Sequence, residues 1–317
     1  MLAVHLDNGG VEVRTVPRPR RPPGFATIRL LYGGLCNTDL ELQRGYYGFR
    51  GTPGHEFVGQ VADADTRSLV GKRVVGEINL NCGKCSWCER GLPNHCPKRS
   101  VLGIVKHPGA FRELLTLPER NLHVVPRAVV NEHAVFTEPL AAACRIQEQL
   151  RMPKGTAVAV LGDGKLGLLV AQVLQAGGAR VHQFGRHRHK LAIAEKAGVS
   201  GEVVQGKLPA RRYPVVVEAT GSAAGLNDAI SLAEPCGTVV MKSTVHGEVG
   251  IDTAPAVVNE ITLMGSRCGP FAPALKLLAS RRVYVDDMIQ DSIRLDYAPL
   301  AFERAAQAGV LKVLIHP

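Results

Sequence analysis

The sequence predicts a chain of two domains, in which an α/β domain with a parallel sheet interrupts a mostly β domain. Two observations lead to this prediction. Residues 1–125 are rich in glycine, proline and short β-branched runs, which is typical of an irregular β domain. Residues 156–185 then have the pattern of an apolar strand, a glycine turn, an apolar helix and a second strand. Such a strand–helix–strand unit is the building block of a parallel sheet.

The boundaries of the two domains follow from where this pattern begins and ends. The chain becomes helical near Asn131, and short irregular elements return after Gly265. Between these points strand and helix signals alternate, with a strand at 213–221, a helix at 222–233, and strands at 236–244 and 260–266. The sequence therefore predicts a doubly wound domain over residues 126–266 and a β-rich domain made of residues 1–125 and 267–317.

The composition is that of a globular protein without a membrane segment. Of the 317 residues, 45% are hydrophobic and 21% are charged, and no apolar run approaches the ~18 residues of a membrane-spanning helix. The N-terminal segment lacks the basic and apolar stretches of a signal peptide, so we expect a cytoplasmic protein. The net charge of +10 admits a nucleic-acid partner, but the 38 basic and 28 acidic residues are spread along the chain. Charge alone therefore does not favour nucleic acid as a partner.

A glycine motif lies between the first strand and the first helix of the α/β domain. Residues 162–167, GDGKLG, fit the pattern G-x-G-x-x-G. In that pattern Gly162 permits the tight turn, Gly164 lets the backbone approach a pyrophosphate, and Gly167 lets helix and strand pack closely. The backbone N–H groups that would face the phosphates of a dinucleotide are those of Asp163, Lys165 and Leu166. The alternative is an ordinary glycine turn without a ligand.

The end of the second strand indicates which dinucleotide would bind. An acidic residue normally stands there, about twenty residues after the glycine turn, and binds the ribose 2′-hydroxyl of NAD. Here the position holds Gly185, followed by Arg186, whose guanidinium can bind a 2′-phosphate. His187 and Lys190 would add positive charge at the start of the next helix. The sequence therefore favours NADP over NAD, with a solvated basic helix face as the alternative.

Four cysteines stand close together in the β-rich domain. Cys82, Cys85, Cys88 and Cys96 have the spacing C-x2-C-x2-C-x7-C. In a reducing compartment such cysteines are metal ligands rather than disulfides, and four thiolates close a tetrahedral zinc site with no open position. A four-cysteine iron–sulfur cluster is the alternative, although nothing else in the sequence suggests electron transfer. The lobe over residues 82–96 is therefore predicted to hold a structural zinc ion.

A second set of metal-binding side chains precedes the cysteine lobe. Cys36 lies in GGLCNTDLE (33–41), and His55 and Glu56 lie in TPGHEFVGQV (52–61). Three protein ligands that leave one coordination position open make a catalytic zinc site. We therefore predict an enzyme with two zinc ions per chain. A zinc-ribbon nucleic-acid binder, the alternative from another class of protein, would explain the cysteine lobe but not this second set.

The motifs resemble, in order and spacing, those of the medium-chain zinc-dependent alcohol dehydrogenases. GGLCNTDLE, PGHEFVG, the cysteine lobe, EPLAAA (138–143) and GDGKLG span essentially the whole chain. The resemblance is greatest to the polyol, sugar and threonine dehydrogenases of that family. It implies a GroES-like catalytic domain, a Rossmann domain, and hydride transfer between NADP(H) and a polyol, sugar or other secondary alcohol. It also implies a homodimer or homotetramer. A relative that keeps its nicotinamide bound for an internal redox step is the alternative enzyme.

The resemblance also implies roles for residues near the catalytic zinc. Glu138, in the EP step, corresponds to a third zinc ligand, and Glu56 corresponds to a carboxylate that exchanges with zinc-bound water. Asp39 is implied to hydrogen-bond His55, which would orient that ring. Thr38 is implied to contact the substrate oxygen and to take its proton.

Three further residues are carried over from the family's pattern. Glu41 stands where many relatives have a histidine that ends the proton relay, as in glucose-dehydrogenase-like members. In the α/β domain, Thr220 of EATG is implied to lie near the cofactor, and Ser243 of KST near its nicotinamide end. The resemblance therefore leaves the proton exit route beyond Thr38 open.

Overall fold

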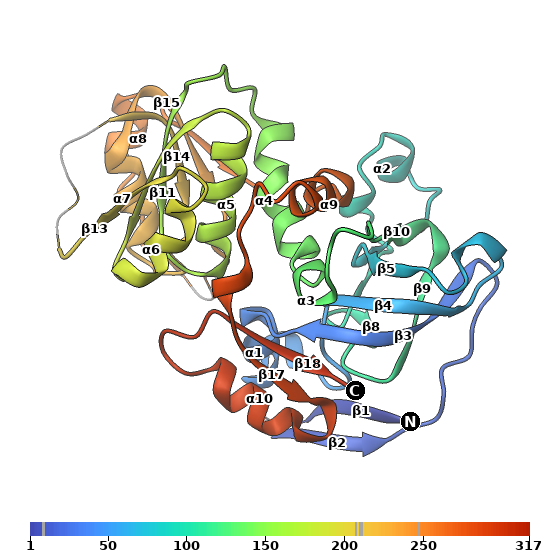
Figure 1. Cartoon of the computed structure of the whole chain (residues 1–317). Coiled ribbons are helices and arrows are strands. Elements are labelled where there is room, and N and C mark those ends of the chain that lie inside the picture. The colour runs from blue at the N-terminus through green and yellow to red at the C-terminus, as the bar shows by residue number, and fades with distance from the viewer. Residues whose placement is uncertain (8–9, 207, 209–211, 246–247) are drawn as a thin grey trace. The chain divides into compact units, whose positions relative to one another are not determined.

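Residues 1–317 are described in the computed structural model, except for 8–9, 207, 209–211 and 246–247 (Figure 1). The chain divides into two units. Unit one comprises Met1–Glu138 and Met288–Pro317, and unit two comprises Pro139–Asp287. Within the described residues, no helix is both long enough and apolar enough to cross a membrane.

Unit one is built on a mostly antiparallel sheet. Its strand order is β10-β5-β4-β3-β18-β17, with β9 paired to β3 (Figure 1). The strands are β3 (Phe25–Gly34), β4 (Glu56–Asp63), β5 (Arg73–Gly76), β9 (Leu114–Pro118), β10 (Leu122–Val124), β17 (Ile289–Arg294) and β18 (Lys312–His316). In β3, Ala26, Ile28 and Leu30 are buried in alternation, which is the period-two pattern of a strand with one face on the core.

Smaller elements complete unit one. They are the antiparallel pair β1 (Leu2–Asp7) and β2 (Gly10–Thr15), the strands β6 (Asn79–Leu80), β7 (Ser100–Leu102) and β8 (Lys106–His107), and the helices α1 (Asn37–Gln43), α2 (Ser86–Glu89), α3 (Asn131–Ala134) and α10 (Ala298–Ala305). The rings of Phe111 and Phe302 meet edge to face at 6.3 Å between centroids. Both rings belong to a buried cluster with Leu35, Leu42 and Val313, which ties the N-terminal and C-terminal segments together.

Unit two is a parallel sheet in the order β13-β12-β11-β14-β15-β16. Its elements are β11 (Ala157–Leu161), α5 (Lys165–Ala176), β12 (Arg180–Gly185), α6 (Arg188–Glu195), β13 (Ser200–Val203), β14 (Tyr213–Glu218), α7 (Gly225–Leu232), β15 (Ala233–Met241), α8 (Ala254–Val258), β16 (Thr262–Gly265) and α9 (Phe271–Ala279). Counted along the chain, this is the doubly wound strand order 3-2-1-4-5-6, and the predicted fold class is confirmed. The order reverses between β11 and β14, where such folds bind ligands beyond the carboxyl ends of the strands.

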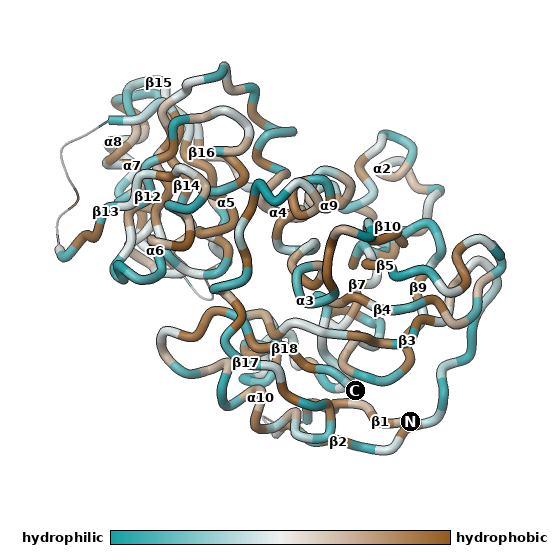
Figure 2. Tube along the Cα trace, viewed as in Figure 1, coloured by the Kyte–Doolittle hydropathy of each residue, from teal (hydrophilic) through white to brown (hydrophobic). Residues whose placement is uncertain are grey.

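Hydrophobic residues form the interior of unit two. Figure 2 shows them along α5, whose residues from Gly167 to Leu174 are all buried. The central strand β11 is buried from Val158 to Leu161. A parallel strand covered on two faces needs apolar residues at every position rather than at alternate ones. This is why residues 157–161 read as a continuous apolar run.

The bounds of unit two differ from those expected for the α/β domain. The expected α/β domain begins at residue 126, whereas unit two begins at Pro139, because α3 contacts β3 and β4 of unit one. It was expected to end at residue 266, whereas unit two continues to Asp287. The side chain of Gln172 on α5 holds this extension, since it donates to the carbonyl of Tyr284 (3.2 Å) and accepts from its N–H (2.7 Å).

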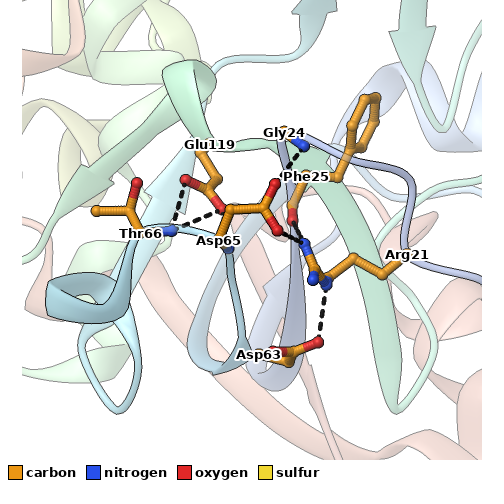
Figure 3. Close-up of polar contacts among 7 residues, drawn as sticks. All are labelled: Arg21, Gly24, Phe25, Asp63, Asp65, Thr66 and Glu119. Carbon is orange, nitrogen blue, oxygen red and sulfur yellow. Dashed lines mark hydrogen bonds and ion pairs between the residues drawn. The ribbon is translucent and has the colours of Figure 1, made fainter.

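A polar cluster fastens the segment before β3 to the end of β4 (Figure 3). Arg21 donates to Asp63 (2.7 Å), to Asp65 (2.5 Å) and to the Phe25 carbonyl (2.9 Å). Asp65 also accepts from the N–H of Gly24 (2.6 Å), and this bond together with Arg21 lowers its pKa. The cluster lies in solvent, so its role is to fix the local chain path rather than to contribute much stability.

Candidate metal centre and dinucleotide site

Cys36, His55 and Glu56 lie together at the ends of two neighbouring strands. Gly34 at the end of β3 pairs with Glu56 at the start of β4, so the residues that follow β3 meet those that begin β4. One ligand atom from each of the three side chains lies within 4.8 Å of the others. Sulfur, imidazole nitrogen and carboxylate oxygen are the donors that zinc binds in proteins, so this set fits the metal.

Asp39 organises the backbone on either side of this cluster. It is fully buried in the first turn of α1, where one oxygen accepts from the N–H of Cys36 (2.9 Å) and the other from the N–H of Gly54 (3.0 Å). The expected partner, His55, lies with Nδ1 3.5 Å from the carboxylate, and that nitrogen has no hydrogen-bond partner among the described residues. Asp39 and His55 are therefore in ion-pair contact, while the hydrogen bonds of Asp39 go to the backbone.

The surroundings of His55 favour its protonated form in the absence of a metal. Burial disfavours the imidazolium, but the negative charge of Asp39 and the Cys36 side chain outweigh this effect. The pKa of His55 therefore lies well above its ordinary value. A metal ion at this site has to displace that proton.

Lys312 is a residue of this site that the sequence analysis missed. Its ammonium group donates to Glu56 Oε2 and to the carbonyl of Leu35 (3.3 Å), and it lies 5.5 Å from the ring centroid of Phe136. Burial alone would lower the pKa of Lys312, but the charges of Glu56, Cys36 and Asp39 raise it. The available signal was a lysine inside the apolar strand LKVLI, which is a position where an unpaired charge would be costly.

The remaining residues expected at this site are placed in different ways. The Cys36 thiol donates weakly to Thr38 Oγ1 (3.7 Å), so Thr38 lies beside the cluster. Glu41 is on the exposed side of α1 and pairs with Arg44 (2.6 Å). Glu138 lies in the first turn of α4 (Thr137–Gln149), but it is not among the described side chains that meet within 4.8 Å.

The four cysteines of the lobe come together as the spacing predicts. One sulfur from each of Cys82, Cys85, Cys88 and Cys96 lies within 4.8 Å of the others, and neighbouring sulfurs are 3.5–3.7 Å apart. Four sulfurs about 2.3 Å from a tetrahedral zinc would be about 3.8 Å apart, so the cage has the size that zinc requires. The N–H of Lys84 contributes most to lowering the pKa of Cys82 to about 6, which favours a thiolate ligand.

The glycine turn has the geometry expected of its three glycines. Gly162 has φ of +112°, and a Cβ there would lie 2.4 Å from the carbonyl oxygen of Ala219. A Cβ at Gly167 would lie 2.4 Å from the carbonyl oxygen of Gly162, whereas one at Gly164 would meet nothing within 4 Å. The turn therefore packs tightly on its inner side and is open at Gly164, ahead of Lys165 at the start of α5 and the next residue, Leu166.

The basic segment after β12 is held by Asp163. One oxygen of Asp163 accepts from the N–H of Arg186 (2.7 Å), the N–H of His187 (2.6 Å) and His187 Nδ1 (3.0 Å). Arg186 and His187 are exposed, and His187 stands at the N-cap position of α6 without a side-chain capping bond. Lys190 is only 6% exposed, and its ammonium group has no hydrogen bond or ion pair within the described part of the chain.

Thr220 and Ser243 are brought together by a residue that the sequence analysis passed over. Glu218, 3% exposed at the end of β14, accepts from Thr220 N (2.7 Å), Thr220 Oγ1 (2.7 Å) and Ser243 Oγ (2.9 Å). These residues lie at the carboxyl ends of β14 and β15, close to where the strand order reverses. The signal in the sequence was the carboxylate that directly follows the apolar run VVV.

Comparisons with known proteins agree with this architecture. Residues 22–127 match the alcohol dehydrogenase GroES-like domain, and residues 166–280 match the zinc-binding dehydrogenase family. The chain is 31% identical over 277 residues to L-threonine 3-dehydrogenase of a Chelativorans species, covering 81% of this chain and 80% of the relative. It is 27% identical over 331 residues to sorbitol dehydrogenase of Halalkalibacterium halodurans, covering 98% and 96%.

A solved structure is similar over the full length. It is a zinc-binding dehydrogenase from Sinorhizobium meliloti in complex with NADP, with a TM-score of 0.90 and 30% sequence identity. The alignment covers 100% of this chain and 99% of the other.

Proposed function

The chain belongs to the medium-chain zinc-dependent alcohol dehydrogenases, in the branch of the polyol and sugar dehydrogenases, and we propose that it transfers hydride between NADP(H) and a polyol, sugar or related secondary alcohol. The observation that carries this proposal is the cluster of Cys36, His55 and Glu56, whose ligand atoms lie within 4.8 Å of one another. The polyol and threonine substrates named for its relatives support a substrate with neighbouring polar groups.

Two ligand sets would hold two zinc ions per chain. Cys36 and His55 would bind the catalytic ion together with Glu138 or Glu56, and the four cysteines of residues 82–96 would bind the structural ion. When bound, the catalytic zinc supplies a Lewis acid that lowers the pKa of an alcohol oxygen. Thiol ligands of this kind persist in a reducing compartment, which supports a cytoplasmic protein.

The chain's own residues would orient the ligands and carry the proton. Asp39 fixes the backbone of Cys36 and Gly54, and so determines where the Cys36 and His55 side chains point. Lys312 holds Glu56 by an ion pair in a buried position. Thr38, next to Cys36, has a hydroxyl that can accept and donate a proton, and Glu41 offers an exposed carboxylate one helical turn further on.

The second unit supports NADP as the cofactor. The open space at Gly164 fits a pyrophosphate, because no atom would meet even a Cβ there within 4 Å. Gly185 leaves no acid at the end of β12, and Arg186 is exposed beside it. Lys190, a buried residue in the first turn of α6, would add a positive charge near a 2′-phosphate. Thr220 and Ser243, held by Glu218, would line the nicotinamide end.

The cofactor preference provides the test of this function. Arg186→Ala should raise the Michaelis constant for NADP by about tenfold or more, since a hydrogen bond to a charged group is worth about 1.5–3 kcal/mol. The Michaelis constant for NAD should change little. The measurement is the oxidation of a panel of polyols with each nucleotide. Equal use of NAD and NADP by the wild type, with no effect of Arg186→Ala, would contradict the proposal.

A homodimer through unit two is the assembly that the fold supports best. β16 is an edge strand of the sheet and carries the exposed Leu263, and the preceding helix α8 carries the exposed Val257 and Val258. An edge strand with apolar side chains readily pairs with another strand. A second copy of the chain, presenting the same edge, would continue the sheet across a two-fold axis.

A further inference from the structure

We infer that Asp163 and Gly185 act as a coupled pair that determines cofactor specificity, because Asp163 occupies the space of a residue-185 side chain and positions Arg186 and His187 for a 2′-phosphate. This inference rests on the proposed NADP site. It goes beyond it by assigning the selectivity to a residue of the glycine turn. Asp163 is in this sense a positioning residue.

The first observation is steric. A Cβ at Gly185 would lie 2.6 Å from the Cβ of Asp163, 2.8 Å from its Cγ and 2.8 Å from its Oδ2. These three atoms are the nearest neighbours, and none is the mobile end of a long side chain. Gly185 does not have a positive φ, so its backbone conformation is open to any residue. Glycine at this position is therefore required by Asp163 and not by the backbone.

The second observation is the set of hydrogen bonds that the Asp163 carboxylate accepts. It is 9% exposed, and one of its oxygens accepts three hydrogen bonds from the segment that links β12 to α6. Burial opposes its ionisation, but the N–H groups of His187 and Arg186 and the His187 ring outweigh this and lower its pKa. The charge of the carboxylate is thus compensated by its donors. In NAD-binding relatives of this fold, an acidic side chain at the position of Gly185 binds the ribose. Here the carboxylate belongs to Asp163 of the glycine turn, and it binds the backbone N–H groups of Arg186 and His187.

The arrangement has a consequence for any exchange of cofactor. Gly185→Asp alone would place a Cβ 2.6–2.8 Å from atoms of the Asp163 side chain and add a second carboxylate beside the first, so that steric overlap and like charge act together. Such a variant should lose the phosphate site without gaining a ribose site. Asp163→Gly combined with Gly185→Asp keeps the net charge and frees the space, so it should create the NAD-type acid.

A binding experiment with a fragment of the cofactor tests the positioning role. The probe is adenosine 2′,5′-bisphosphate, titrated calorimetrically into the zinc-loaded full chain. If Asp163 acted only by its charge, Asp163→Ala would tighten binding of the phosphate. We expect the opposite sign, with the dissociation constant raised about fivefold or more by Asp163→Ala and changed less than about twofold by Asp163→Asn. Unchanged or tighter binding by Asp163→Ala would overturn the inference.

A second experiment tests the coupling without any ligand. Gly185→Ala should lower the melting temperature by about 3 °C or more in the wild-type background, and by less than about 1 °C in the Asp163→Gly background. Equal losses in the two backgrounds would overturn the coupling. If the wild type binds ADP as tightly as adenosine 2′,5′-bisphosphate, the NADP proposal fails, while the melting comparison still decides whether the two residues are coupled.

Discussion

Lys312 and Glu56 are a charged pair almost without solvent contact, with side chains 1% and 2% exposed. Removing two charges from water is costly, and the cost is offset only while both partners are present. Gly34 preserves the room for this pair, since a Cβ there would lie 2.9 Å from Glu56 Oε2 and 2.6 Å from a methyl group of Val135. The residues around the pair therefore leave no room for a side chain at position 34.

Lys312→Met should destabilise the protein strongly, because it leaves the Glu56 carboxylate buried without a counter-charge. The expected loss is about 3–5 kcal/mol in the free energy of unfolding, measured by denaturant titration. The control is Lys312→Met combined with Glu56→Gln, which removes both charges and should recover most of the loss. A single variant as stable as the wild type, or a double variant no better than the single, would show that the pair does not carry this energy.

The raised pKa of His55 makes the metal-free protein sensitive to pH. A group whose pKa is higher in the folded state contributes stability below its unfolded pKa, about 6.5 for histidine, and this contribution disappears as pH rises through the folded pKa. The unfolding free energy of the chelated wild type should therefore fall with rising pH above about 6.5 relative to that of His55→Asn. Parallel pH profiles for the two proteins would contradict this explanation.

Single polar residues inside apolar strands were the least predictable part of the site. The sequence places Cys36, His55 and Glu56 in one set because their residue types and motifs are distinctive. Lys312 and Glu218 also bind residues that are distant in the sequence, namely Glu56 of β4 and Ser243 just after β15, and which strands lie near one another is a property of the folded sheet. A charged residue in an apolar run could have been flagged from the sequence, although its partner could not.

At the scale of elements, the two groups of cysteine ligands differ in how they are supported. Cys36 lies between β3 and α1, which both bury apolar residues, whereas the regular structure of the lobe over residues 82–96 is limited to the one-turn helix α2 and the 3-10 turn Pro93–His95. If the lobe binds the proposed zinc ion, a segment with so little regular structure would depend on that ion for its order. The same substitution should therefore have different effects in the two places.

Cys85→Ser should lower the melting temperature or the solubility, and Cys36→Ser should abolish turnover while the fold stays cooperative. Metal analysis should find about two zinc ions per chain in the wild type and about one in each variant. Thermal unfolding followed by circular dichroism is the measurement, and each variant serves as the control for the other. Two variants that lose activity at an unchanged melting temperature would argue against a structural site in the lobe.

The edge strand β16 allows a test of assembly. Leu263→Lys should convert a dimer into a monomer, since a charged side chain on an edge strand opposes pairing. The control is Val124→Lys, because Val124 is likewise exposed on an end strand, β10 of unit one, and should have no effect on mass. Light scattering after size-exclusion chromatography gives the masses. A monomeric wild-type protein would contradict the proposed dimer.

At the scale of the whole molecule, the candidate metal ligands and the dinucleotide motif belong to different units. Cys36, His55 and the four cysteines of residues 82–96 lie in unit one, while the glycine turn, Asp163 and Arg186 lie in unit two. Sequence patterns predicted this division of labour, because each motif is local. Unit two spans Pro139–Asp287, whereas the expected domain spans residues 126–266, and its C-terminal part is held by contacts such as that of Gln172 with Tyr284, 112 residues apart.

Removal of zinc should therefore leave nucleotide binding almost unchanged. Treatment with a chelator should abolish turnover and lower the stability of unit one, because the ligand sets of that unit lose their metals. The dissociation constant for adenosine 2′,5′-bisphosphate should stay within about twofold of its value before treatment. A much weaker affinity after chelation would indicate that the units are energetically coupled.

The pairing of β18 with β3 has a consequence for how the protein is made. Glu56 and Lys312 are separated by 256 positions, and the whole of unit two is synthesised between them. Unit two is continuous from Pro139 to Asp287, so it can fold while the ribosome is still translating. Until β18 is synthesised, the N-terminal strands lack their pairing partner, and the Glu56 carboxylate lacks the counter-charge of Lys312. We expect a nascent chain arrested before residue 312 to be held by chaperones and to expose its thiols to alkylation.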